Sequence, residues 1–198
     1  MTTTKVRILD TTAELFRRYG YTGTGLKQVV AEAGAPFGSV YHFFPGGKAQ
    51  LGEEVIRRSG QMYLELVLAV LDGATDLVAG VRDVFRGAAE VLRETDYIDA
   101  CPIATVALEM ASSNEVLRVA TADVFESWTA AATGRFERAG IAAGPARLLA
   151  MAVIELLEGA FLLSRAARAT EALDAAGSAA VALVRAALPS RRAGQRDG

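Results

Sequence analysis

The stretch from Thr24 to Lys48, TGLKQVVAEAGAPFGSVYHFFPGGK, predicts two short helices joined by a tight turn. Thr24 is a suitable cap for the first helix, and Gly34 is the kind of residue that commonly follows a helix. Pro36 suits the first turn of the second helix, and Pro45-Gly46-Gly47 ends it. Such a pair is typical of a helix-turn-helix, whose second helix enters the major groove of DNA.

Apolar residues recur at helical spacing on both sides of this stretch, and no long alternating strand pattern is present, so we predict an all-α fold. The expected nine helices cover about 6–19, 24–33, 37–44, 48–71, 75–94, 103–111, 115–139, 146–169 and 171–188. We divide the chain into an N-terminal three-helix DNA-binding domain (1–49), a C-terminal helical ligand-binding and dimerisation domain (50–188), and a flexible tail (189–198).

The composition is that of a globular protein, with 198 residues of which 52% are hydrophobic and 22% charged. The first 60 residues carry eight basic and five acidic side chains, a net charge of +3, so the rest carries −5 to reach the total of −2. This asymmetry fits a polyanion-binding N-terminal part, although chance explains so small an excess equally well. A single cysteine, Cys101, excludes an intramolecular disulfide. With no signal peptide or membrane span in the sequence, we expect a cytoplasmic protein.

Two lysines oppose the usual electrostatics of helix starts. Lys27 and Lys48 fall in predicted first turns, where a cation costs about 0.3–1 kcal/mol. A phosphate docked at each helix start explains both residues. The alternative is that exposed lysines tolerate this cost.

The third predicted helix has more aromatic side chains than its packing needs. Val40 and Phe44 can face inward, which leaves the other aromatic residues for contact with DNA. Gly38 would allow a close approach to DNA, or it simply weakens the helix by about 1 kcal/mol. The predicted DNA-contacting residues are Thr24, Lys27, Ala35, Pro36, Phe37, Gly38, Ser39, Tyr41, His42 and Lys48.

The segment from Tyr19 to Lys48 resembles the N-terminal signature of TetR-family regulators, in particular the LmrA/YxaF-like branch. Cys101-Pro102-Ile103 and Val106-Ala107-Leu108-Glu109 resemble that branch too. The resemblance implies a homodimer, generally a repressor, that binds a pseudo-palindromic operator in double-stranded DNA and is released by a small effector. Phe37 and Phe43 stand where the branch usually has a basic residue and a His, so the operator of relatives cannot be transferred.

The resemblance also implies an effector pocket and a dimer interface in the C-terminal domain. Methionine and aromatic side chains suit a flat apolar or aromatic effector, although each also fits an ordinary core position. The predicted pocket residues are Met62, Leu66, Phe85, Leu92, Ile103, Met110, Phe125, Trp128, Met151 and Phe161. The last two helices can pair with their copies as a four-helix bundle, or both can be buried within one subunit. The predicted dimer residues are Leu148, Ala152, Gly159, Leu162, Ala176, Ala180 and Leu183.

A helical enzyme is the main alternative from another class, and a DNA-binding dimer without a ligand is a third. The single histidine, His42, lies in the predicted recognition helix, and no zinc, phosphate-loop or dinucleotide motif is present. We therefore predict no catalytic residue, no metal and no cofactor.

Overall fold

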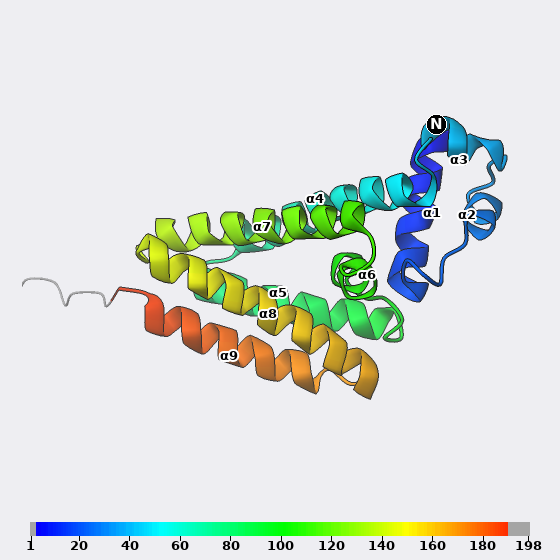
Figure 1. Cartoon of the computed structure of the whole chain (residues 1–198). Coiled ribbons are helices and arrows are strands. Elements are labelled where there is room, and N and C mark those ends of the chain that lie inside the picture. The colour runs from blue at the N-terminus through cyan, green and yellow to red at the C-terminus, as the bar shows by residue number, and fades with distance from the viewer. Residues whose placement is uncertain (1–2, 190–198) are drawn as a thin grey trace, which may run out of the picture.

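The computed structural model describes residues 3–189, which form nine helices and no strand (Figure 1). The helices are α1 (Thr4–Tyr19), α2 (Leu26–Glu32), α3 (Gly38–Phe43), α4 (Gly47–Gly73), α5 (Leu77–Glu94), α6 (Pro102–Met110), α7 (Glu115–Arg138), α8 (Ala143–Ala167) and α9 (Glu171–Ala187). The predicted all-α class and order of helices are confirmed. Apart from Pro189, the predicted tail lies outside the described residues.

Side-chain caps fix several helix starts. A helix leaves its first four backbone N–H groups without partners, and a side-chain oxygen before the helix can accept from one of them. The hydroxyl of Thr3 and the side-chain oxygens of Asp76 and Asn114 do this at α1, α5 and α7, over 3.3, 2.8 and 3.2 Å respectively. These polar residues set boundaries that the apolar spacing alone leaves vague.

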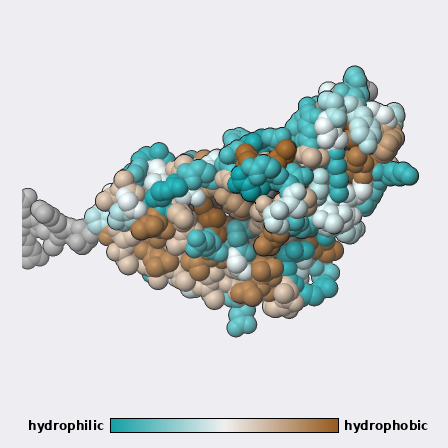
Figure 2. Space-filling view, in the orientation of Figure 1, coloured by the Kyte–Doolittle hydropathy of each residue, from teal (hydrophilic) through white to brown (hydrophobic). Residues whose placement is uncertain are grey.

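The molecule is elongated, with α1, α2 and α3 gathered at one end (Figure 1). The long helix α4 leaves this end with α7 packed along it, while α5, α8 and α9 pack together farther away. The short helix α6 lies between the two parts and touches both α1 and α4. In the space-filling view, the face formed by α8 and α9 carries several hydrophobic patches (Figure 2).

Two clusters of buried side chains form the core. The first includes Phe16 of α1 and Leu51 of α4, and it continues into Ile103 of α6 and Leu117 of α7. The second joins α5, α8 and α9 around residues such as Leu173. Because the first cluster reaches α6 and α7, helices α1–α3 share their core with the helices that follow.

The predicted cap at Thr24 is wrong. The residue that precedes α2 is Gly25, and it makes no side-chain capping bond. Thr24 is only 1% exposed, and its hydroxyl donates to the carbonyl of Gly20 over 2.7 Å. This side chain therefore closes the α1–α2 loop and is not available to DNA. The loop predicted before α8 is also shorter than expected, because Pro145 fits within the first turn of the helix.

Candidate nucleic-acid interface

The turn between α2 and α3 is a Schellman motif. The N–H of Ala35 donates to the carbonyl of Val30 over 2.9 Å, and that of Gly34 to Ala31 over 3.3 Å. Gly34 has a φ of 59°, a left-handed conformation that glycine adopts without steric cost. The predicted role of Gly34 as the residue after the helix is confirmed, and it sets the angle at which α3 leaves α2.

Arg7 of α1 holds the same turn from the other side. Its Nε donates to the carbonyl of Ala33 over 3.1 Å, and its Nη2 to that of Gly34 over 3.4 Å. A guanidinium at this end also complements the negative end of the α2 dipole. The sequence reasoning missed Arg7, because nothing in its spacing links it to a turn 27 residues away.

Helix α3 is anchored on one face and presents aromatic rings on the other. Val40 and Phe44 are 0% exposed, which confirms their predicted inward positions. Phe37 and Tyr41 are 44% and 51% exposed, and their rings meet edge to face with centroids 5.9 Å apart. His42 is also exposed, and its ring packs against Phe43 at 4.8 Å. An exposed aromatic pair beside a histidine is a surface suited to contact bases and phosphates.

Gly38, the first residue of α3, faces open space. A Cβ atom built on it would meet nothing within 4 Å. Packing within the chain therefore does not require glycine here.

The structure brings most of the predicted DNA-contacting residues to one end of the molecule, and it exposes them to different degrees. Ala35, Ser39 and Lys48 are half-buried and Thr24 is buried. The exposed members are Lys27, Pro36, Phe37, Gly38, Tyr41 and His42.

The two predicted phosphate-binding lysines differ in their surroundings. Lys27 is exposed in the first turn of α2 and forms no ion pair within residues 3–189. The ammonium of Lys48 instead donates to the carbonyl of Tyr21 over 2.6 Å and lies 4.2 Å above the Tyr21 ring. Burial lowers the pKa of Lys48, and the nearby Glu109 carboxylate opposes this shift. Lys48 therefore faces back into the protein in this conformation.

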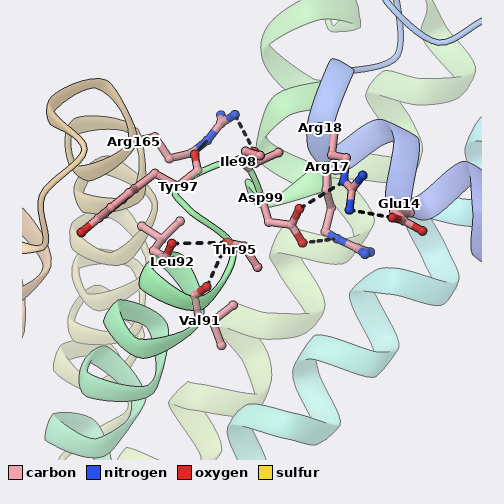
Figure 3. Close-up of polar contacts among 10 residues, drawn as sticks. All are labelled: Glu14, Arg17, Arg18, Val91, Leu92, Thr95, Tyr97, Ile98, Asp99 and Arg165. Carbon is pink, nitrogen blue, oxygen red and sulfur yellow. Dashed lines mark hydrogen bonds and ion pairs between the residues drawn. The ribbon is translucent and has the colours of Figure 1, made fainter.

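Polar contacts join α1 and the α1–α2 loop to the rest of the chain. Arg17 of α1 pairs with Asp99 of the α5–α6 loop over 2.9 Å, and Arg18 lies 3.9 Å from the same carboxylate (Figure 3). Across the same junction, the backbone N–H of Thr22 donates to Glu109 of α6 over 2.7 Å. The sequence reasoning missed these pairs, which link residues more than 80 positions apart.

The predicted effector residues do not line one cavity. Phe85, Leu92 and Ile103 are fully packed in the two cores, whereas Met62, Leu66 and Met151 are 51%, 57% and 41% exposed. Met110, Phe125 and Trp128 are partly buried against the first core, and Phe161 against the second. A groove of about 290 Å³ between α1 and α4 includes Met62 of this set.

One acidic group is largely buried on α8. Burial raises the pKa of Glu158 on α8 to about 7, and a hydrogen bond with Cys101 at the start of α6 opposes the shift. Burial likewise raises the pKa of Cys101, so its thiol stays protonated.

The predicted dimer residues fall into two groups. Leu148 and Leu162 on α8 are 70% and 59% exposed, and Leu183 on α9 is 43% exposed. Gly159 is exposed between the two leucines, and Ala152 is half-buried. Ala176 and Ala180 are wrong as dimer residues, because they are 8% and 0% exposed and pack in the core of their own subunit.

Within residues 3–189, no group of three His, Cys, Asp or Glu side chains is placed to hold a metal ion. No helix in that range combines the length and hydrophobicity needed to cross a bilayer.

Two separate segments of the chain match known protein families. Residues 8–55 match the tetR family of bacterial regulatory proteins, and residues 78–179 match the C-terminal domain of LmrA/YxaF-like transcriptional regulators. The uncharacterised HTH-type transcriptional regulator YxaF of Bacillus subtilis is 35% identical over 158 residues, which are 80% of this chain and 83% of that protein. The HTH-type transcriptional regulator LmrA of the same organism is 30% identical over 162 residues, or 82% and 86% of the two chains.

Solved structures share the fold. A TetR transcriptional regulator from Legionella pneumophila superposes with a TM-score of 0.80 at 19% identity, over 96% of this chain and 99% of that one. A TetR transcriptional regulator from Chloroflexus aurantiacus gives a TM-score of 0.78 at 25% identity, over 93% and 96% of the two chains.

Proposed function

This chain belongs to the tetR family of bacterial regulatory proteins, in its LmrA/YxaF-like branch, and we propose that it represses transcription by binding a pseudo-palindromic operator as a homodimer. Its relatives are transcriptional regulators rather than enzymes. The observation that carries the proposal is the exposed face of α3, where Phe37, Tyr41 and His42 stand outward from a helix anchored by Val40 and Phe44.

In the proposed complex, α3 of each subunit lies in the major groove, and the two copies occupy successive grooves about 34–36 Å apart. Tyr41 and His42 reach base edges or phosphates, and Phe37 packs against thymine methyl groups. Lys27 contacts a phosphate at the start of α2, where backbone N–H groups and the ammonium point the same way. Lys48 contacts a second phosphate through the N–H donors that its bond to the Tyr21 carbonyl leaves over.

The dimer forms through the outer face of α8 and α9. The side chains of Leu148, Leu162 and Leu183 are 43–70% exposed in the single subunit. They support this proposal, because monomeric soluble proteins rarely leave large contiguous apolar patches in water. Gly159 lies between the two α8 leucines and permits close approach of a second helix.

The effector is a small apolar or aromatic molecule that binds among α4–α8 and favours a conformation with the wrong separation of the two α3 helices. DNA release then follows from the different affinities of the effector for the two states. Half-exposed Met62 and Leu66 on α4, and the partly buried Met110, Phe125 and Trp128, support an apolar ligand.

Gel shift at low salt with duplex DNA from upstream of the protein's own gene tests the regulator proposal. We expect a salt-sensitive complex, because phosphate contacts release counterions. If the protein does not shift the duplex at low salt, the proposal fails.

Trp128 is the single tryptophan, so its fluorescence reports effector binding when aromatic compounds are titrated. A compound that binds without releasing the DNA would contradict the effector mechanism.

A further inference from the structure

We propose that Glu109 of α6 and Lys48 of α4 clamp the α1–α2 loop between them, and that this clamp transmits the position of α6 to the DNA-binding helices. The inference rests on the proposed function, since it concerns how that binding surface is held. Glu109 and Lys48 are positioning residues here, and the clamped segment is Gly20–Thr22.

Glu109 holds one side of the segment. Its Oε2 accepts from the backbone N–H of Thr22 over 2.7 Å, and the hydroxyl of Thr22 lies 4.0 Å from the sulfur of Met110. An N–H bound to a carboxylate is a charge-assisted hydrogen bond, the stronger class of such bonds. The contact comes from the last turn of α6, so any shift of that turn moves the Thr22 backbone.

Lys48 holds the other side. Its ammonium donates to the carbonyl of Tyr21 over 2.6 Å and stacks on the Tyr21 ring at 4.2 Å. Tyr21 is itself only 8% exposed and meets Phe16 edge to face at 5.5 Å, so the carbonyl is a fixed point. Glu109 acts electrostatically on Lys48. The carboxylate and the ammonium thus bind opposite sides of one peptide group, the one between Tyr21 and Thr22.

Gly20 is fitted to this clamp. Its φ of 73° is left-handed, and a Cβ atom on Gly20 would collide with the Glu109 carboxylate. The left-handed backbone favours glycine at this position, and the absence of a side chain leaves room for the Glu109 carboxylate. The hydroxyl of Thr24 then donates to the Gly20 carbonyl over 2.7 Å.

The clamp controls two elements of the proposed DNA surface. The Gly20–Thr22 segment leads within a few residues into α2, where Lys27 is exposed. Lys48 is a predicted phosphate contact, and its bond to the Tyr21 carbonyl fixes where its remaining N–H donors point. Because α6 also packs in the first core through Ile103 and Val106, a displacement of this helix reaches both lysines.

The test is a double-mutant cycle in the full-length protein. The probe is a duplex that the wild-type protein selects from a randomised library, and its Kd is measured by fluorescence anisotropy. Glu109→Ala removes the acceptor, Glu109→Asp shortens its reach, and Glu109→Gln keeps an acceptor of the same length. Each is combined with Lys48→Met. Asp99→Ala is the matched control, because it removes another junction contact with α1 and leaves Gly20–Thr22 untouched.

We expect Glu109→Ala and Glu109→Asp to weaken the selected-duplex affinity about tenfold, and Glu109→Gln to stay within about twofold of wild type. In the Lys48→Met background the effect of Glu109→Ala should shrink to about twofold, because residues in one network are not additive. Asp99→Ala should combine additively with Lys48→Met. Additive effects of Glu109→Ala and Lys48→Met, or equal effects of the Gln and Ala variants, would overturn the clamp.

Amide hydrogen exchange separates this inference from the proposed function. In Glu109→Ala, and in Glu109→Asp if the alanine variant does not fold, exchange of the Thr22 amide should accelerate at least about tenfold, and Glu109→Gln should restore protection. If the library yields no enriched duplex, the regulator proposal fails while this readout still decides on the clamp. Unchanged exchange at Thr22 in a folded Glu109 variant would overturn it.

Discussion

Replacing Gly38 by alanine should stabilise the protein and weaken its binding to DNA. Gly38 is the first residue of α3, and a Cβ atom there meets nothing within 4 Å of this chain. Alanine restricts the unfolded chain more than glycine does and is the better helix former. The expected gain is about 0.4–1 kcal/mol, which for a chain of this length raises the Tm by about 1–4 °C.

The expected loss of DNA affinity has a different cause. If α3 lies in the major groove, the Gly38 position faces the duplex, and an added methyl group displaces the helix from its base contacts. Loss of one or more such contacts costs about 1–3 kcal/mol, or roughly 5- to 150-fold in Kd. The Tm is measured by differential scanning calorimetry at one protein concentration, because the Tm of a dimer depends on concentration. The Kd is measured by fluorescence anisotropy, with protein titrated into labelled duplex.

Gly134→Ala is the matched control for this prediction. Gly134 lies inside α7, and a Cβ atom on it also meets nothing within 4 Å. This variant should gain about 1 kcal/mol of stability with no change in DNA affinity. A lower Tm for Gly38→Ala would refute the inference that the position is open within the chain. An unchanged Kd would refute the close approach of this part of α3 to DNA.

The remaining predictions concern other parts of the molecule. Tyr41→Ala should weaken DNA binding about fivefold or more while the Tm changes little, because the side chain is 51% exposed; an unchanged Kd would contradict the assignment of α3 as the recognition helix. Lys27→Ala should weaken binding about equally for all duplexes and reduce the salt dependence by about two counterions per dimer, which a titration of log Kd against log salt measures. Leu148→Glu should give monomers at micromolar concentration in light scattering. The control Leu108→Glu, on an 80% exposed residue of α6, should leave the dimer intact. If both variants are dimers, the α8 face is not the dimer interface. The folded-state pKa of Glu158, about 7, lies above the ordinary value, so the folded state binds this proton more tightly. The free energy of unfolding should therefore fall by about 3 kcal/mol as the pH rises from about 4.5 to 7. Glu158→Gln should flatten that interval in urea titrations, and an equal slope in both proteins would contradict the burial of the acid.

Much of the fold follows from local chemistry that the sequence displays directly. The α2–α3 turn needs a left-handed residue, and only Gly34 in that segment adopts this conformation without cost, so the motif was predictable from the chain itself. Val40 and Phe44 were predictable as inward residues, because helical spacing on so short an element leaves few apolar pairs that share a face. The resemblance to TetR-family regulators, drawn from Tyr19–Lys48 and the Cys101 segment, is confirmed by the matches in both domains.

The details of the site depended on contacts between distant residues. Thr24 looks like a helix cap in the sequence, but the hydroxyl finds the Gly20 carbonyl instead. Lys48 looks like a free cation at a helix start, but the fold supplies the Tyr21 carbonyl and ring as partners. A local pattern cannot distinguish these outcomes, because each depends on which backbone group lies within about 3 Å after the chain has folded.

The sequence by itself determined that this chain is helical, that residues 24–48 form a helix-turn-helix, and to which family it belongs. Periodicity, caps and turn residues act over a few positions, so they are written in the chain directly. Only the tertiary structure decided which alanines of α9 are internal, which leucines of α8 face outward, and that Glu109 meets Thr22. These depend on how long helices pack, and packing brings together side chains that the sequence separates by more than 80 residues.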